Sequence, residues 1–195
     1  MSERFVNTIV IHCAASPNGA PLFEGKHGAA DFKTPDRVID GWHLKRGFHR
    51  GDAWRTAFNP GLGSIGYHFL IGTNGALYTG RHLDEIGAHA AGNNKASIGV
   101  CMLGTDRFTR AQWERLKALI SELKAKYTNE DRGPRILGHR DLSPDADGDG
   151  EVEQHEWLKI CPGFDVATWL ANDMRPDPAH LFDPTPPAAA MKQAA

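Results

Sequence analysis

A short apolar segment near the start of the chain ends abruptly in a histidine. Residues 5–12 read FVNTIVIH, and a loop rich in Gly, Pro and Ser follows them. A run of this length that is rich in β-branched side chains predicts a buried strand. The chain must therefore fold so that a buried strand delivers a polar side chain, His12, to the place where the strand ends.

The other apolar patterns alternate between strand and helix. Thr109 and Gln112 form a capping box at the start of the most regular helical pattern. Further strands are predicted at 67–71, 76–79 (after a turn at 73–75), 97–103 and 135–137, and helices at 34–47, 109–127 and 164–169. Residues 50–64 are predicted to form a loop. The sequence thus indicates a single-domain α/β fold over residues 1–174, followed by a flexible Pro/Ala-rich tail at 175–195.

Composition excludes several classes of protein. The 195 residues are 41% apolar and 24% charged, which is typical of one globular domain. No apolar stretch reaches the roughly 18 residues of a membrane span, so we expect no stable membrane insertion. The start of the chain has no signal-peptide core, which predicts synthesis in the cytoplasm. The sequence has no stripe of basic residues, so nucleic-acid binding is not expected. An odd number of cysteines, three, does not favour a disulfide framework. We expect the protein to be a monomer.

Acidic residues are concentrated in one short window. Six of the 24 acids lie between residues 145 and 156, where there is no Lys or Arg. The window matches the pattern D-x-D-x-D-G-x5-E, in which alternate carboxylates and a closing glutamate surround Ca²⁺ and Gly150 permits the sharp turn. The predicted calcium ligands are Asp145, Asp147, Asp149, Glu151 (through its backbone carbonyl) and Glu156. Calcium sensors normally pair two such loops, and only one is present here, which favours a structural Ca²⁺ site. The alternative is that the window is a solvated acidic loop that binds no ion.

One cysteine and two histidines stand where a metal site could form. His139 follows a short predicted strand, and Cys161 lies in a turn-prone Lys-Ile-Cys-Pro-Gly segment. With His12 they would make a three-ligand zinc site that leaves the fourth position open, as in catalytic zinc sites. Spacing alone does not establish this, because His12 lies far from the other two residues in the sequence, and each histidine taken alone is more often a hydrogen-bonded core or edge residue than a metal ligand. Cys13 and Cys101 fit apolar strands and are predicted to be inert core thiols.

Six segments follow one another along the chain in a recognisable order. They are IVIH at 9–12, GYHF at 66–69, GAHA at 87–90, SIGV at 97–100, GHRD at 138–141 and KICPGFD at 159–165. This set resembles the zinc N-acetylmuramoyl-L-alanine amidases, which include the phage lysozymes of amidase type and the peptidoglycan recognition proteins, and the resemblance runs from about residue 8 to residue 169. It implies a central mixed β-sheet flanked by helices, and a bacterial peptidoglycan substrate.

The resemblance also implies roles for individual residues. Its zinc ligands fall on His12, His139 and Cys161, and its catalytic side chains on Tyr67 and Lys159. Strand alternation predicts that Tyr67 shares a face with Phe69 and that His68 points to the other face. Residues that border the substrate groove in relatives correspond to His89, Asn94 and, on a flanking helix, Trp42, for which core packing is an equally good explanation.

The chain departs from the simplest phage pattern in two places. The loop before Gly66 is longer, and the acidic window is inserted between the zinc ligands His139 and Cys161. Ligands of one metal must be held to a fraction of an ångström. Bound Ca²⁺ is therefore expected to order the insert and to support zinc binding.

The expected function is zinc-dependent hydrolysis of the amide between N-acetylmuramic acid and L-alanine, by a phage endolysin that reaches the wall after membrane permeabilisation. No glutamate is obviously placed as the general base. The alternatives are a cytoplasmic amidase that recycles wall fragments, a non-catalytic peptidoglycan-binding module, and a cysteine peptidase that uses Cys161 and His139.

Overall fold

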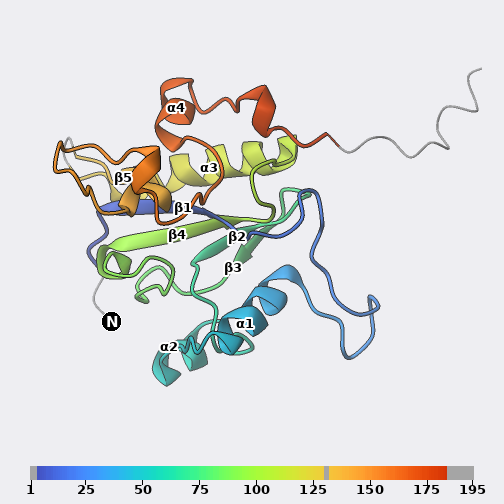
Figure 1. The fold of residues 1–195 in the computed structure, drawn as a ribbon. Coiled ribbons are helices and arrows are strands. Elements are labelled where there is room, and N and C mark those ends of the chain that lie inside the picture. Colours follow the sequence, from blue (N-terminus) through green and yellow to red (C-terminus); the bar gives the residue numbers. More distant parts are fainter. Residues whose placement is uncertain (1–3, 130–131, 184–195) are drawn as a thin grey trace, which may run out of the picture.

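The fold is built on one mixed sheet, seen in a computed structural model that describes residues 4–129 and 132–183 (Figure 1). Strands β1, β2, β4 and β5 run parallel to one another, and β3 pairs antiparallel with β2 at one edge of the sheet. In spatial order the strands are β3 (Leu77–Thr79), β2 (Phe69–Ile71), β4 (Ser97–Met102), β1 (Thr8–Cys13) and β5 (Arg135–Gly138). The expected mixed sheet and the 73–75 hairpin turn are confirmed.

Helices cover both faces of the sheet (Figure 1). The α3 helix (Arg110–Tyr127) and the α4 helix (Val166–Ala171) lie on one side, and α1 (Pro35–Lys45) and α2 (Asp52–Ala57) lie on the other. Short 3-10 helices occur at Asn94–Ala96, Arg140–Leu142, Gln154–Glu156 and Pro178–His180. The prediction of a loop at 50–64 is wrong for residues 52–57, which form the α2 helix. Sequence periodicity could not reveal this helix, because none of its six side chains is buried and it therefore has no apolar pattern.

Alternation along the central strands divides the core into two clusters. Every residue of β4 is buried. Ile98, Val100 and Met102 pack with the apolar face of α3 in the larger cluster, whereas Cys101 packs with Ile39 of α1 in the smaller one. Alternate residues of a strand share a face. Ile9 and Ile11 of β1 pack in the larger cluster. His12, which follows Ile11 and pairs with Cys101, therefore lies on the α1 side. That side is where the candidate site lies.

The α3 helix begins where the sequence predicts. The Thr109 hydroxyl accepts a hydrogen bond from the Gln112 amide at 3.2 Å, and the Gln112 side chain accepts one from the Thr109 amide at 3.0 Å. These two bonds satisfy backbone donors that the first helical turn leaves free. The predicted capping box is therefore confirmed.

Part of the segment expected to be a free tail is docked on the domain. The backbone of Phe108 donates to the carbonyl of His180 and accepts from Phe182, each at 2.9 Å. The ring of Phe182 covers Gly19, where a Cβ atom would lie 2.2 Å from it. Residues 178–182 thus pack on the domain, and residues 184–195 of the predicted tail lie outside the described residues. Among the described residues, no helix is both long and apolar enough to cross a membrane.

Candidate metal centre and active-site cavity

Two histidines lie side by side because the strands that carry them are neighbours. Ile11 of β1 pairs with Gly138, the last residue of β5, so the next residues, His12 within β1 and His139 just after β5, lie side by side. The His139 amide continues the ladder by donating to the Ile11 carbonyl at 3.0 Å. The two imidazole centroids are 4.5 Å apart. The carboxyl ends of adjacent parallel strands, a common place for ligand sites, thus bring together two potential metal ligands.

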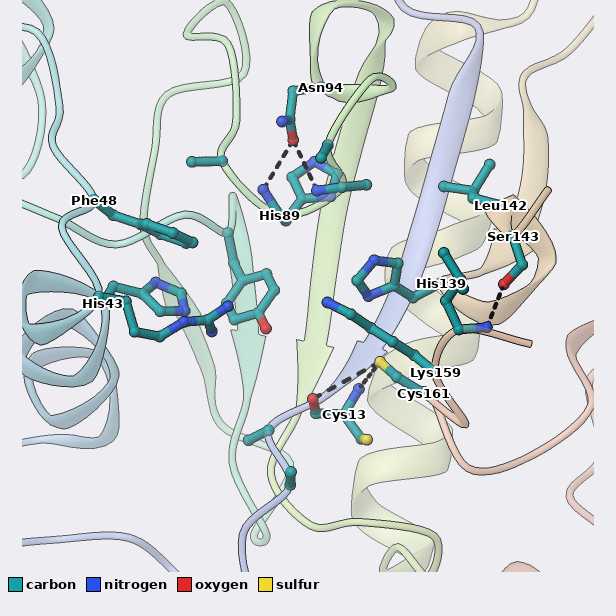
Figure 2. A pocket seen from close by; sticks show the side chains of 18 residues that line it. Cys13, His43, Phe48, His89, Asn94, His139, Leu142, Ser143, Lys159 and Cys161 are labelled. Carbon is teal, nitrogen blue, oxygen red and sulfur yellow. Dashed lines mark hydrogen bonds between the residues drawn. The ribbon is translucent and has the colours of Figure 1, made fainter. Parts of the chain in front are cut away.

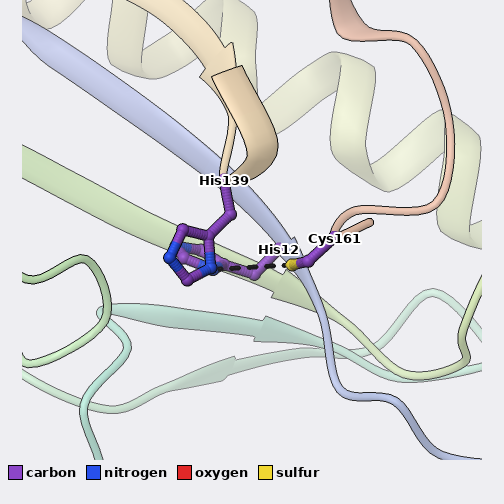
Figure 3. A group of neighbouring side chains, drawn as sticks. All are labelled: His12, His139 and Cys161. Atoms are coloured by element: carbon purple, nitrogen blue, oxygen red, sulfur yellow. Dashed lines mark hydrogen bonds between the residues drawn. The ribbon is translucent and has the colours of Figure 1, made fainter. Parts of the chain in front are cut away.

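Cys161 lies beside the two histidines, although it comes from an irregular segment later in the chain. Its Sγ atom lies 3.8 Å from Nδ1 of His12 and accepts a hydrogen bond from the Cys13 amide at 3.2 Å. One donor atom each from His12, His139 and Cys161 lies within 4.8 Å of the other two, and Figure 3 shows the three side chains converging. The sequence-predicted ligands are therefore adjacent in space, although they come from distant parts of the chain.

The donor set fits a zinc ion. Two imidazoles and one thiol are the ligand types of catalytic zinc sites, which keep a fourth position open. Burial, and then the nearby His89, lower the pKa of His12 well below its ordinary value. Burial, followed by Lys159 and Arg46, lowers the pKa of His139 to about 4. Both rings are consequently neutral near pH 7, which is the form that binds a metal.

The Cys161 thiol lies beside a second thiol, that of Cys13. A hydrogen bond with the Cys13 thiol, and then burial, raise the pKa of the Cys161 thiol. Catalytic cysteines have a lowered pKa, whereas a thiol that coordinates a metal is deprotonated by the ion itself. The expectation of an inert core thiol fits Cys101, which is fully buried. Cys13 packs against the larger core cluster, but it is only half-buried and also borders the cavity.

A cavity of about 560 Å³ opens beside these ligands (Figure 2). Its walls come from α1, from the loop before β4 and from the segment before Cys161. Arg46 and Lys159 bring positive charge to it, and no carboxylate lines it among the described residues. A cationic cavity without acidic groups favours an anionic substrate.

Tyr67 faces the metal ligands, but not for the reason that strand alternation suggests. Its ring centroid lies 5.1 Å from that of His12. Tyr67 packs against the same cluster as Leu70, whereas Phe69 packs against the cluster on the other face. The prediction that Tyr67 and Phe69 share a face is wrong because β2 begins only at Phe69. Burial raises the pKa of Tyr67 well above its ordinary value, so its hydroxyl remains protonated.

The three residues expected to border the groove separate into two groups. His89 and Asn94 line the cavity, and the Asn94 side chain accepts hydrogen bonds from the amides of His89 and Ala90 at 2.8 and 2.9 Å (Figure 2). Trp42 does not line the cavity; it packs against the smaller core cluster. The core-packing explanation of Trp42 is the one that the structure supports.

The comparison with known families agrees with this geometry. A family model described as N-acetylmuramoyl-L-alanine amidase matches residues 2–163. The chain belongs to this amidase family. It is therefore an enzyme that hydrolyses the amide between N-acetylmuramic acid and L-alanine in peptidoglycan.

Individual relatives and structures extend the likeness over most of the amidase. The endolysin of Klebsiella phage KP32 is 30% identical over 169 residues, which cover 83% of each protein. The solved structure of the N-acetylmuramoyl-L-alanine amidase LysC from Clostridium intestinale URNW matches with a TM-score of 0.56 and 23% identity, over 88% of each chain. Drosophila PGRP-LB matches with a TM-score of 0.52 and 23% identity, over 93% of this chain and 88% of its own. The two structures establish the shared fold.

The acidic window of this amidase is an exposed loop between two metal-ligand candidates. One carboxylate oxygen each from Asp145, Asp147 and Asp149 lies within 4.8 Å of the other two. Gly150 has a φ of 94°, which glycine adopts without strain. Glu156 is buried, and its carboxylate accepts hydrogen bonds from the amides of Ala146 at 2.5 Å and Glu153 at 3.0 Å. The predicted turn at Gly150 is therefore present.

Sequence reasoning missed several residues that shape the amidase site. His43 and Arg46 line the cavity from α1, and Phe48 follows them, with its ring 4.9 Å from the Arg46 guanidinium carbon. The pattern His-x-x-Arg-x-Phe on and just after a predicted helix was the available signal. Arg140, next to His139, is also buried, and only its location in the fold reveals what it contacts.

Proposed function

We propose that this amidase is a zinc enzyme in which His12, His139 and Cys161 hold the ion. The observation that carries the proposal is the convergence of one sulfur and two neutral imidazole donors beside a cationic cavity. Zinc held by such a set supplies a Lewis acid for the scissile carbonyl and lowers the pKa of a water molecule at its open position.

Lys159 and Tyr67 are the proposed catalytic side chains. The Lys159 ammonium lies in the cavity, and its charge is felt at both histidine ligands, whose pKa values it lowers. The Tyr67 hydroxyl stays protonated, so it can donate a hydrogen bond to negative charge that develops on the substrate oxygen. Lys159 stabilises the same charge electrostatically, and it can deliver a proton to the leaving amine of L-alanine.

The negative charge of the substrate complements the positive charge of the residues that line the cavity. Peptidoglycan stem peptides carry carboxylates, and Arg46 and Lys159 both line the cavity. Asn94 and His89 line it as well. We assign these four residues to the substrate-binding surface, and we do not include Trp42.

The proposed biological role is that of a phage endolysin, supported by the KP32 endolysin match over 83% of each protein. An endolysin must open intact sacculi. An amidase that recycles wall fragments instead cleaves soluble muropeptides and leaves sacculi whole. Clearing of purified sacculi by the isolated chain is the expected result, and cleavage of soluble fragments alone would assign it to recycling.

Mass spectrometry of the products tests the reaction and the metal together. We expect intact glycan strands and stem peptides with a free N-terminal L-alanine, and we expect a zinc chelator to abolish both. Restoration by added Zn²⁺ is the control. Cleavage within the peptide that survives chelation would instead indicate the cysteine peptidase, and binding without cleavage would indicate a recognition module.

We further propose that the acidic loop binds Ca²⁺ through Asp145, Asp147, Asp149, Glu156 and the Glu151 carbonyl. The support is the complete ligand pattern together with three carboxylates held close to one another at the surface. Like charges at this distance repel, and a hard divalent cation with six to eight oxygen ligands relieves that repulsion.

The loop is connected to the zinc ligands through the residues that follow Glu156. Trp157 stacks on the Arg140 guanidinium, whose carbon lies 4.0 Å from the ring centre. The Arg140 amide in turn donates to the Cys161 carbonyl at 2.8 Å. Ser143 closes the base of the insert by accepting from the Leu158 amide at 3.1 Å (Figure 2). Ordering the loop therefore also restricts the segment that carries Lys159 and Cys161.

Calorimetric titration with Ca²⁺ tests this second proposal. We expect binding in the native chain and its loss in the double variant Asp147→Asn/Asp149→Asn, and we expect zinc affinity to fall when Ca²⁺ is removed. Absence of Ca²⁺ binding by the native chain would leave the window as a solvated acidic loop.

A further inference from the structure

His89 is a buried imidazole that contacts a candidate zinc ligand directly. Its Nδ1 atom lies 3.0 Å from Nε2 of His12, with the two rings nearly perpendicular. His12 therefore uses one ring nitrogen toward His89, while the other, Nδ1, faces Cys161. A ligand histidine needs its free lone pair on the nitrogen that faces the metal, so the contact with His89 bears on whether His12 is ready to bind.

The hydrogen bonds beyond His89 set the direction of this contact. The Ser97 hydroxyl lies 2.7 Å from the Asn93 carbonyl and 3.4 Å from Nε2 of His89. A carbonyl only accepts, so Ser97 donates to Asn93 and is left to accept from Nε2–H of His89. Nδ1 of His89 then carries no proton and must accept from Nε2–H of His12. The lone pair of His12 is thereby left on Nδ1, toward Cys161.

The fold holds the His89 ring in a space that only glycine leaves open. A Cβ atom at Gly87 would lie 2.5 Å from the His89 ring, and one at Gly99 would lie 2.6 Å from it. Asn94 fixes the His89 backbone from the other side through the amide hydrogen bonds described above. The ring is therefore packed closely against the backbone at Gly87 and at Gly99 of β4, in the orientation that contacts His12.

We propose that His89 and Ser97 are positioning residues that fix the tautomer and orientation of His12 before zinc arrives. The relay runs from His12 through His89 and Ser97 to the Asn93 carbonyl. This inference rests on the proposed zinc site, and it gives His89 a role in metal binding that is additional to lining the substrate cavity. Partners of this kind typically change metal affinity by about 10- to 100-fold.

Zinc affinity, measured by competition with a chromophoric chelator, tests the relay. His89→Leu removes the acceptor and is expected to weaken zinc binding about 10- to 100-fold. His89→Asn places an amide oxygen near the position of Nδ1 and is expected to restore most of the affinity. The matched control is His68→Gln. This buried imidazole touches the edge of the His89 ring but bonds to the Gly99 amide and the Glu85 carbonyl, not to a ligand, so its replacement should lower stability and change zinc affinity less than His89→Leu does.

Nitrogen-15 NMR of the metal-free protein tests the tautomer without zinc or substrate. We expect His12 to carry its proton on Nε2 in the native chain, and Ser97→Ala to produce a mixture of tautomers. Ser97→Ala removes one buried hydroxyl and is the variant that remains informative if His89→Leu does not fold.

Two results would overturn the relay: a proton on Nδ1 of His12 in the native chain, or equal zinc affinity in native, His89→Leu and His89→Asn proteins. An equal loss in His89→Leu, His89→Asn and His68→Gln would likewise reduce His89 to a packing residue. Failure of the zinc proposal is a separate outcome, because the native chain itself would then bind no zinc.

Discussion

The candidate zinc ligands are held in two different ways. His12 and His139 stand at the ends of hydrogen-bonded neighbouring strands in the core of the sheet. Cys161 and Lys159 lie on irregular chain after an exposed acidic insert, and their position depends on a few side-chain contacts to Arg140, Ser143 and Cys13. The fold thus builds a rigid half-site, which a loop must complete. Ligands from both halves are expected to be required for the site to exist, and the order of the insert is expected to set how tightly the site binds zinc.

Loss of a ligand from either half has the largest expected effect. His12→Ala and Cys161→Ala each leave two donors, too few for a catalytic zinc site, so amidase activity and bound zinc should both fall to background. The sheet should survive, because neither side chain belongs to the two apolar clusters. Atomic absorption, a turbidity assay and circular dichroism measure the three quantities. Wild-type turnover in either variant would remove that residue from the metal site.

Loss of a catalytic side chain comes next. Tyr67→Phe removes one hydrogen-bond donor to the developing charge and should lower kcat by about 10²- to 10³-fold. Lys159→Met, in the segment after the insert, should have an effect of similar size, and both variants should keep stoichiometric zinc. Steady-state kinetics with soluble muropeptides separates kcat from KM. A change in KM alone would make these residues substrate-binding rather than catalytic.

A smaller effect is expected from loosening the insert. Trp157→Leu removes the aromatic face that covers the buried Arg140 guanidinium, a contact of up to about 2 kcal/mol, and should weaken zinc binding by up to about tenfold. Trp54→Leu is the matched control, because Trp54 stacks on His82, away from the cavity. Equal effects of the two variants on zinc affinity would mean that the insert does not support the metal site.

A last effect comes from acid and concerns the stability of the sheet, not the metal site. Burial lowers the pKa of His68 to about 3, so the unfolded chain takes up this proton first as the pH falls. Stability from neutral His68 is complete above pH 6.5 and declines below it, by about 0.8 kcal/mol at pH 6 and further toward pH 3. Urea unfolding of metal-free native and His68→Gln proteins at pH 5–8 should give curves that converge in acid. Parallel curves would contradict this account of His68.

The rigid half of the site was the more predictable half. A β-branched run ending in His12 and a short strand ending before His139 are local patterns, and parallel pairing brings their ends together. The family resemblance was needed to add Cys161, since nothing local relates it to His12. Regular helices with strong caps, such as α3, were equally accessible to prediction.

What could not be predicted depends on irregular backbone or on distant contacts. Tyr67 lies just before β2, where strand alternation no longer applies. The docking of residues 178–182 depends on pairing with Phe108, about 70 positions earlier in the chain. The role of Arg140 is visible only when Trp157, Asp165 and the Cys161 carbonyl surround it.

X-ray absorption at the zinc K edge tests the joining of the two halves most directly. We predict two nitrogen neighbours at about 2.0 Å and one sulfur neighbour at about 2.3 Å from the metal, with the sulfur signal lost in Cys161→Ala. A first shell of nitrogen and oxygen alone in the native protein would show that Cys161, in the segment after the insert, is not a ligand, and this result would contradict the account.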